Sequence, residues 1–557
     1  MNKKLSYFFS IAVVILFEGC GKENKTDPPP PPPASLTFNS FKINGQFSGF
    51  TYYNINRSPV LKFSFSTPVN RSTVAGSFTF VDKVNNTVAF TATYENNDST
   101  VVIQPAAALE YLKKYTVTVS TSLKSTGGSS LLSGQDINFI TQIDSSRKFP
   151  AITDNTLLDL VQQQTFKYFW DFGHPVSGLA RERNTSGDIV TSGGSGFGIM
   201  AIITGINRGF ITKAQGLTRM QTIVNFLKNT AQKFHGAFPH WLNGSTGVVI
   251  PFSTKDNGAD LVETSYLVQG LLCARQYFTD AGVAETALRN DINAICNGVE
   301  WNWFRNGGQN VLYWHWSPSY NWEMNLPIRG WNECLVTYVL AASSPTFGIP
   351  AAVYNNGWKA SAGFLNGNTY FGYQLPLGPP QGGPLFFSHY SFLGINPNGL
   401  TDASANYATQ TKNHTLINYN YCKANPRSFF GYSDSVWGLT ASDIEGGYTA
   451  SSPTNDVSVI APTAALSSFP YTPNESMAAL KFFYYVLGDK IWKEYGFVDA
   501  FSLHNTWFAN SFLAIDQGPI IVMIENHRSG LLWNLFTSCP EVKTGMLSLG
   551  FTAPYLL

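Results

Sequence analysis

Two acidic side chains, Asp260 and Glu263, stand three positions apart in the segment GADLVETSY. Residues three apart on a helix share one face, so this spacing would present two carboxyl groups to the same space. Neighbouring carboxyl groups can perform general acid–base chemistry, in which one gives a proton and another takes one. The structural alternative is a capping box, in which an N-cap Asp is followed three residues later by Glu. Both interpretations hold together if the start of this helix faces a pocket.

A third acidic residue, Glu333, follows IRGWN and precedes the apolar run CLVTYVLAA, which places it in the first turn of another helix. The helix dipole alone favours a glutamate there. The surroundings of Glu333 indicate a functional role in addition to this helix position, because it follows Arg329, Trp331 and an aromatic loop. A carboxyl group that aromatic rings shield from water has a raised pKa, which suits a general acid. Glu323, on the loop itself, is the lesser candidate.

The fourth acidic position is Asp516, between two apolar runs in FLAIDQGPIIVMIENHRSG. An isolated buried charge is prohibitively costly, so this carboxylate must emerge at a loop or be paired. We expect Gly518 and Pro519 to form a turn and restart a helix there, with proline tolerated in its first turn. Asp516 then either caps a helix or is presented at the mouth of a pocket.

Aromatic residues precede the third of these positions, Glu333. Six of the 13 tryptophans fall between Trp301 and Trp331, and Trp314, Trp316 and Trp322 alternate with His, Ser, Pro and Asn. This mixture is typical of a groove lined with rings, not of a core helix. The C–H faces of a glucose ring pack on such rings, while amide and carboxylate groups bind the hydroxyls. Flat rings with paired acids are what glycosidic-bond hydrolysis requires.

The elements that must position these residues differ along the chain. Residues 35–143 alternate between apolar and polar types in about seven short runs, which predicts a β-sandwich. From residue 150 the period becomes helical, beginning with a helix capped by Thr153 and Asp154. Further helices are expected at 197–207, 213–234, 260–278, 284–304, 331–342, 475–487, 505–515 and 519–537. A helical barrel would gather many helix N-termini and their loops at one face.

The first residues have a separate function. Lys3 and Lys4 precede an apolar run that ends in Glu18, Gly19 and Cys20, a secretory signal too short to span a bilayer. We expect a lipoprotein signal peptide over residues 1–20, ending at a lipidated cysteine, Cys20. The alternative is an ordinary signal peptide without lipid. Residues 21–34 form a proline-rich linker with six consecutive prolines, which would hold a folded body away from a membrane.

Composition narrows the choice of ligand. The formal net charge of the 557 residues is +1, charged residues make up 13% and aromatic residues 15%. A chain with so little net charge has no strong positive electrostatic field to attract nucleic acid. Its high aromatic content favours a neutral ligand with flat faces. The cysteines show no paired spacing and the eight histidines no HExxH, so we expect neither a disulfide framework nor a transition-metal site. A calcium site is left open, and no cofactor is expected.

Five ordered motifs resemble one known family. They are GADLVETSYLVQGLLCARQYF, IRGWNECLVTYVLAASSPT, PLFFSHYSFLGINP, WGLTASD and FLAIDQGPIIVMIENHRSGLLW, and the resemblance covers roughly residues 150–557. They are similar to the glycoamylase-like family of bacterial proteins, in particular glycoside hydrolase family 144, the β-1,2-glucanases, often found as lipoproteins. Residues 35–143 resemble the bacterial Ig-like domains that precede secreted enzymes, which implies a spacer without catalysis.

The resemblance implies an (α/α)6 barrel and inverting hydrolysis of β-1,2-glucan to sophorose or short sophoro-oligosaccharides, without a cofactor. It implies Glu333 as proton donor and Asp516 as the carboxylate that activates water, with Asp260 and Glu263 holding sugar hydroxyls. Other substrate-binding positions in the resulting set are Arg329, Trp331, Trp314, Trp316, Trp322, His389, Tyr390 and Asp443. The protein is expected to be a monomer in the outer membrane, facing the cell surface or the periplasm.

Two alternatives remain open at this stage. One is a lipoprotein that binds glycans without cleaving them, for which the groove lined with aromatic rings (the aromatic floor) alone would suffice. The other is a glucoamylase-like α-glucan hydrolase, because the same barrel serves starch-degrading enzymes. Glu445, in the GLTASDIEGGY loop, could close a subsite, so the choice between endo- and exo-action is open as well.

Overall fold

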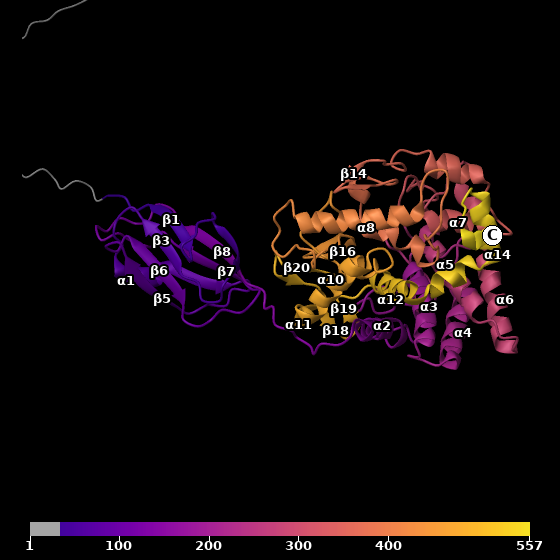
Figure 1. Cartoon of the computed structure of the whole chain (residues 1–557), viewed down its shortest axis with the longest axis horizontal. Helices are drawn as coiled ribbons and strands as arrows, with labels where there is room; N and C mark the ends of the chain where they lie inside the picture. Colours follow the sequence, from indigo (N-terminus) through magenta and orange to yellow (C-terminus); the bar gives the residue numbers. More distant parts are fainter. Residues whose placement is uncertain (1–33) are drawn as a thin grey trace, which may run out of the picture. The chain divides into compact units, whose positions relative to one another are not determined.

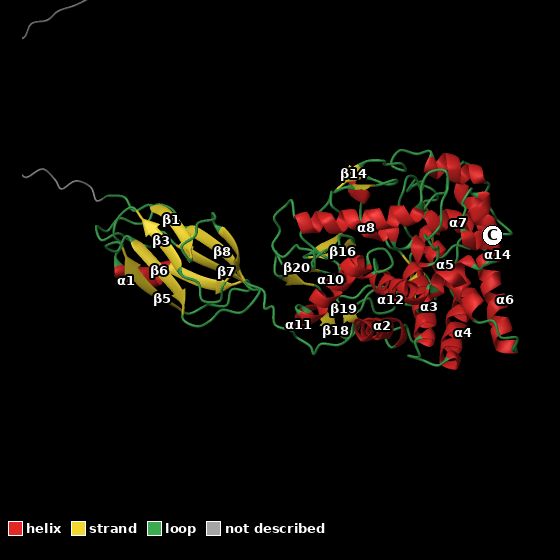
Figure 2. Ribbon diagram, viewed as in Figure 1, coloured by secondary structure: helices red, strands yellow, loops and turns green. Residues whose placement is uncertain are grey.

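The structure is a computed structural model and describes residues 34–557. These residues divide into two compact units, each described here by itself. One comprises the chain up to Thr51, Ser58–Ala108 and Tyr115–Asn138, and the other comprises Tyr52–Arg57, Leu109–Lys114 and Phe139–Leu557. Strands dominate the first and helices the second (Figures 1 and 2). The expected signal peptide, lipidated Cys20 and proline-rich linker to residue 33 lie outside the described residues.

The N-terminal strands form two four-stranded sheets, in the orders β1-β3-β6-β5 and β2-β8-β7-β4. Their bounds are β1 Phe38–Ile43, β2 Thr51–Ile55, β3 Leu61–Phe65, β4 Phe78–Asp82, β5 Phe90–Glu95, β6 Thr100–Pro105, β7 Lys114–Val119 and β8 Gln135–Thr141, with a short helix α1 at Arg71–Ser77. In β3 every second side chain is buried, among them Phe63, as the two-residue period of a strand requires. The predicted Ig-like architecture is confirmed.

The second unit is helical, as expected. Its helices are α2 Asp154–Trp170, α3 Ser192–Asn207, α4 Lys213–Asn229, α5 Leu261–Tyr277, α6 Val283–Asn297, α7 Leu335–Ser343, α8 Tyr407–Ala424, α9 Pro462–Leu466, α10 Pro473–Tyr485, α11 Gly488–Ile491, α12 Ala514–Ser529, α13 Leu531–Thr537 and α14 Pro540–Ser548. The side chain of Thr153 accepts a hydrogen bond from Thr156 N–H and so caps α2, as predicted. Among the described residues, no helix is long and apolar enough to cross a membrane.

Short strands occupy the loops between these helices. They are β9 Ile189–Thr191, β10 Trp241–Asn243 and β11 Val249–Ile250 in one sheet, and the pairs β12 Ala259–Asp260 with β13 His315–Trp316, β14 Thr369–Tyr370 with β15 Tyr373–Gln374, β16 Ala441–Ile444 with β17 Gly447–Ala450, β18 Trp492–Lys493 with β19 Gly496–Phe497, and β20 Phe501–Ser502 with β21 Trp507–Phe508. The β12–β13 pair joins the aromatic loop directly to the start of α5.

Glycines allow the central helices to approach closely. Helix α3 packs against both α5 and α12. A Cβ added at Gly196 of α3 would lie 2.1 Å from the carbonyl oxygen of Tyr266 on α5, and one at Gly270 would lie 2.2 Å from the carbonyl oxygen of Gly196. Only residues without a side chain fit these positions. The close α3–α5 contact fixes the N-termini of both helices beside each other.

Two sequence expectations about the C-terminal part are wrong. Residues 505–515 do not form a helix, because Trp507–Phe508 pair as a strand with Phe501–Ser502. Gly518 and Pro519 do not form a turn either, since α12 runs unbroken from Ala514 with both residues inside it. Gly518 serves packing instead, because an added Cβ there would lie 2.4 Å from Phe197 Cβ on α3.

Candidate active site

A cavity of about 530 Å³ opens in the helical unit, among the loops that precede α3, α5, α7 and α12. Its size falls within the roughly 300–1,000 Å³ typical of small-molecule sites. Of the expected site residues, it is lined by Asp260, Glu263, Glu333, Trp314 and Tyr390. The sequence motifs therefore meet in one place, although they are far apart in the chain.

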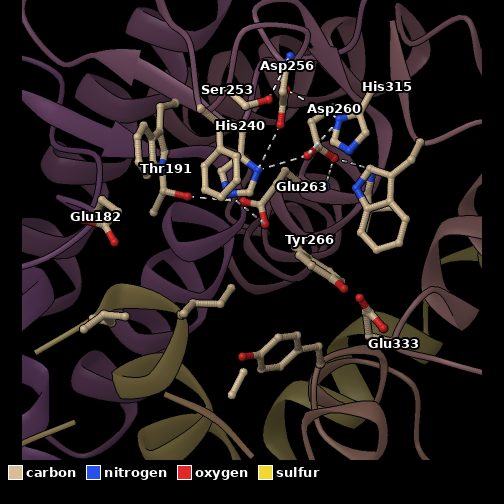
Figure 3. Close-up of a pocket in the computed structure, with 18 of the residues that line it drawn as sticks. Glu182, Thr191, His240, Ser253, Asp256, Asp260, Glu263, Tyr266, His315 and Glu333 are labelled. Carbon is tan, nitrogen blue, oxygen red and sulfur yellow. Dashed lines mark hydrogen bonds and ion pairs between the residues drawn. The ribbon is translucent and has the colours of Figure 1, made fainter. Parts of the chain in front are cut away.

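Asp260 is both a helix cap and a cavity residue. Its Oδ1 accepts hydrogen bonds from the backbone N–H groups of Val262 at 3.0 Å and Glu263 at 2.9 Å, and the side chain is fully buried. Its Oδ2 faces His240 Nδ1 at 3.1 Å and His315 Nδ1 at 3.6 Å (Figure 3). Burial opposes its charge, but the two histidines and the helix amides hold the pKa of Asp260 below its usual range. Asp260 is thus an ionised carboxylate.

The histidines and Asp256 were not foreseen from the sequence. Asp256 is 4% exposed, and its Oδ2 lies 3.8 Å from His240 Nδ1, while its Oδ1 lies 3.5 Å from His315 Nδ1. Burial opposes protonation of His240, but Glu263, Asp260 and Asp256 outweigh it and raise its pKa to about 9. His240, Asp256 and Asp260 offer ligand atoms within 4.8 Å of one another, so this group could also hold a cation. As a protonated imidazole, His240 balances the carboxylates itself.

Glu263 projects from the first turn of α5 and is 8% exposed. Its Oε2 accepts hydrogen bonds from Gly193 N–H at 2.7 Å and Thr191 Oγ1 at 3.2 Å, at the start of α3. The other oxygen, Oε1, lies 4.0 Å from His240 Nε2. Burial raises the pKa of Glu263, and the Asp260 charge adds to it, although His240 opposes them. One oxygen is therefore held firmly while the other remains available within the cavity.

Glu333 lies across Tyr266 from this group, and the Tyr266 hydroxyl points toward its carboxyl group (Figure 3). Burial, with smaller contributions from the Asp260 and Glu263 charges, raises the pKa of Glu333 to about 7. The Tyr266 hydroxyl is buried and has no hydrogen-bond partner among the described residues. A carboxyl group with this pKa holds its proton in a large share of molecules at neutral pH, as a general acid must.

Asp516 is not among the residues that line the cavity, although its neighbours Leu513 and Ile515 are. It is 1% exposed and interacts directly with the carboxyl group of Asp499. Burial first, and then the charge of Asp499, raise the pKa of Asp516 well above its usual range. The structure therefore places Asp516 as a neutral acid behind the cavity wall.

Asp443 lies next to the Asp499–Asp516 pair, but its carboxylate is bound by the guanidinium group of Arg183. It accepts hydrogen bonds from Arg183 Nη1 at 3.2 Å to each oxygen and from Ser511 Oγ at 2.5 Å. Its backbone N–H donates to Asp499 Oδ2 at 2.7 Å. Arg183 lines the cavity, whereas Asp443 lines an adjoining hollow.

The expected aromatic floor is only partly assembled. Trp314 lines the cavity, but Trp316 and Trp322 pack on Trp303, with ring centroids 5.3 and 4.7 Å away. Trp316 also packs edge-on against His235, with 5.4 Å between the ring centroids, so the loop does not present all its rings to one space. The rings that line the cavity and were missed in the sequence are Trp241, Phe252, Tyr266, Phe386 and Tyr448. Single aromatic residues scattered over many loops leave no local pattern.

Three further expected residues lie outside the cavity lining. Trp331 is 3% exposed and stacks on Trp358 at 5.8 Å between ring centroids. Arg329 donates to the carbonyl oxygen of Gly357 at 3.2 Å. His389 is buried beside Ser468 Oγ at 3.0 Å, and burial lowers its pKa to about 3. These residues support the walls and do not face the cavity.

The fold and the site together define a class of protein. A helical scaffold encloses a cavity that carries a carboxyl group of raised pKa, further carboxyl groups and several aromatic rings, the equipment of a glycoside hydrolase. Comparison with known proteins agrees with this class. The model of the family described as "Putative glucoamylase" matches residues 325–540, and the bacterial Ig-like domain model matches residues 51–141.

Individual relatives carry more specific names. An exo β-1,2-glucooligosaccharide sophorohydrolase (non-reducing end) of Parabacteroides distasonis is 46% identical over 428 residues, which are 73% of this chain and 59% of that protein. The solved endo-β-1,2-glucanase from Chitinophaga pinensis is 52% identical, with a TM-score of 0.71 over 73% of this chain and 100% of its own. A solved β-1,2-glucanase from Parabacteroides distasonis is 37% identical, with a TM-score of 0.71 over 93% of this chain and 73% of its own.

The chain belongs to the glycoamylase-like family that contains these bacterial glucanases, glycoside hydrolase family 144. The expected resemblance, for both the helical unit and the Ig-like unit, is thereby confirmed.

Proposed function

We propose that this protein hydrolyses β-1,2-glucan and releases sophorose or short sophoro-oligosaccharides with inversion at the anomeric carbon. The family and the names of its glucan-cleaving relatives support the substrate. The observation that carries the proposal is Glu333, whose pKa is about 7, in a cavity shared with Asp260 and Glu263. A glycan-binding protein without catalysis has no use for a buried acid poised at neutral pH.

In the proposed reaction Glu333 donates its proton to the glycosidic oxygen as the bond from that oxygen to the anomeric carbon breaks. A water molecule attacks the opposite face of the anomeric carbon, and its proton passes to a carboxylate. Asp260 is less suited to accept it, because one of its oxygens caps α5 and the other faces His240 and His315. It would instead orient the histidines toward sugar hydroxyls.

Two carboxyl groups remain candidates for the base. Asp516 was expected to be the base from the family resemblance, but it lies behind the lining, and its side chain interacts with the carboxyl group of Asp499. Glu263 lines the cavity, and its Oε1 is available to a water molecule while Gly193 and Thr191 hold Oε2. We therefore assign the base to Glu263.

The test uses purified protein without residues 1–33 and linear β-1,2-glucan, with products followed by chromatography and anomeric NMR. We expect sophorose or its oligomers to appear first as the α-anomer. Glu333→Gln should lower kcat by about 10²–10⁴, the range of general acid catalysis. The matched control Glu323→Gln, on an exposed loop residue paired with Lys255, should leave kcat unchanged. Cleavage of maltodextrin but not β-1,2-glucan would overturn the substrate assignment.

The assignment of Glu263 as the base is tested by comparing variants of Glu263 and Asp516 with and without azide. Glu263→Ala should be inactive in buffer and partly restored by azide, which would attack from the water side and give an α-glucosyl azide. Asp516→Asn should keep measurable activity without azide. Azide rescue of Asp516→Ala and not of Glu263→Ala would return the role to Asp516.

We further propose that the helices close into an (α/α)6 barrel, and that Cys20 carries a lipid that anchors a monomer to the outer membrane. The signal-like segment ending in Gly19 and Cys20 supports the anchor. Radiolabelled palmitate should be incorporated into the full chain but not into Cys20→Ser.

A further inference from the structure

A second hollow, of about 340 Å³, adjoins the cavity. Its lining includes Arg183, Asn184, Asp443, Trp507, Asn510 and Ser511. Arg183 lines both spaces, so the hollow and the cavity meet at this side chain.

The wall between the two spaces consists of one ion pair and one hairpin. Arg183 Nη1 and Asp443 Oδ2 lie 3.2 Å apart. In the β16–β17 hairpin, Ala441 and Tyr448 line the cavity, whereas Ile444 and Gly447 line the hollow. The hairpin therefore contributes side chains to both spaces.

The hollow offers the groups that bind a sugar. Trp507 is half-buried, and among residues 34–557 no aromatic ring stacks on it. The exposed Asn510 side-chain amide likewise has no hydrogen-bond partner within the described chain. An indole ring with a free face packs on the C–H face of a pyranose, and a free amide donates to and accepts from hydroxyl groups.

The charges of the hollow do not favour an anionic ligand. Arg183 is bound by two carboxylates, since its Nε donates to Glu182 at 2.9 Å and its Nη1 to Asp443 at 3.2 Å. Within the lining of the hollow the charge of Arg183 is balanced by Asp443, so no net positive charge favours phosphates or acidic sugars. An uncharged polyhydroxylated ligand fits both the charge and the exposed ring.

We propose that this hollow binds glucose units of a β-1,2-glucan chain whose cleaved linkage lies in the main cavity. Trp507 supplies the stacking surface and Asn510 binds hydroxyl groups. The inference rests on the proposed function and adds to it a preference for chains long enough to pass the Arg183–Asp443 ion pair. Short oligosaccharides that fill the main cavity alone do not reach the hollow.

The test compares long linear β-1,2-glucan with the shortest sophoro-oligosaccharide that the protein cleaves. For Trp507→Ala we expect kcat/KM on the long glucan to fall about tenfold, with no change on the short substrate. Asn510→Ala should give a smaller loss of the same kind, and Trp507→Phe should retain most of the activity on long chains. Phe371→Ala removes another exposed ring, 44% exposed and outside both linings, and is the matched control.

Binding supplies an independent measurement. In the Glu333→Gln background, electrophoresis through a gel containing β-1,2-glucan should show less retardation after Trp507→Ala. Unchanged retardation with an unchanged long-to-short ratio in both variants would overturn the proposed subsite, while wild-type cleavage of β-1,2-glucan would still support the function. Equal losses on long and short substrates would also overturn it. If the wild type cleaves no β-1,2-glucan, both proposals fall.

Discussion

Glu263 Oε2, on α5, accepts a hydrogen bond from the backbone N–H of Gly193, on α3, at 2.7 Å. This contact couples the candidate base to the close packing of two helices. A Cβ added at Gly193 would lie 2.5 Å from Glu263 Oε2 and 2.9 Å from Tyr266 Cδ2, closer than such atoms approach. Position 193 therefore controls where the carboxylate stands.

From this contact we predict that Gly193→Ala lowers kcat by about tenfold or more, because small misplacements of a reacting group are costly in rate. Circular dichroism should show a helical content equal to that of the wild type. Gly282→Ala is the matched control, since nothing lies within 4 Å of an added Cβ there. Wild-type kcat in Gly193→Ala would mean that the position of Glu263 does not limit the reaction.

The pH dependence of kcat/KM should follow the protonation of Glu333. The acid must be protonated to react, and burial raises its pKa to about 7, so kcat/KM should fall about tenfold per pH unit above that value. Loss of activity only above about pH 9 would instead point to His240, whose pKa is about 9. Initial rates on β-1,2-glucan from pH 5 to 10, in buffers of equal ionic strength, distinguish the two.

Stability should fall as the pH rises, because of the acids behind the cavity. Burial first, and then the Asp443 charge, raise the pKa of Asp499 to about 7, and the pKa of Asp516 is raised as well. A group whose folded pKa is raised stabilises the fold below its unfolded pKa and loses this contribution as the pH rises through its folded pKa. The wild-type Tm should therefore decrease between about pH 5 and pH 8.

Asp499→Asn should remove part of that decrease. An asparagine oxygen can still accept from Asp443 N–H, and no charge is left to bury. The variant should match the wild-type Tm near pH 5 and exceed it at pH 8, as measured by calorimetry. Asp434→Asn, at an exposed carboxylate, should leave the pH dependence unchanged. A wild-type slope retained in Asp499→Asn would exclude this carboxyl group as its source.

A buried ion pair away from the cavity should matter for stability alone. Glu525 on α12 is fully buried and accepts from Arg208 Nε at 2.6 Å, Asn207 Nδ2 at 3.0 Å and Gln162 Nε2 at 3.1 Å, which joins α12 to α2 and α3. Glu525→Ala leaves Arg208 unpaired and should lower the free energy of unfolding by about 3–5 kcal/mol. Asp154→Asn, in an exposed ion pair with Lys481, should cost at most about 1 kcal/mol.

Denaturant unfolding of the helical unit measures both changes, and kcat of the folded Glu525→Ala protein at low temperature should stay near the wild-type value. Equal stability of the two variants would contradict the role assigned to the buried pair.

Helix α8, at Tyr407–Ala424, shows why some elements escape prediction. Its buried face carries Gln410, His414 and Asn418, which bond to loops: Gln410 to Leu377, His414 to Gly383 and Asn418 to Leu439. A helix whose buried side is polar has no apolar period to detect. Its partners lie in loops that sequence spacing does not bring together.

The sequence by itself determined the two architectures, the family and the placement of Asp260 and Glu263 at a helix start. These follow from the spacing of apolar residues, from capping residues and from ordered motifs, all of which can be recognised within short stretches of sequence. The expected first-turn position of Glu333 is wrong, because α7 begins only at Leu335 and Glu333 lies in the turn before it. Only the tertiary structure decided that Trp331 supports a wall, that Asp516 lies behind the lining and that His240 balances the carboxylates. Burial and electrostatic environment depend on contacts between distant segments, and those contacts form only when the chain has folded.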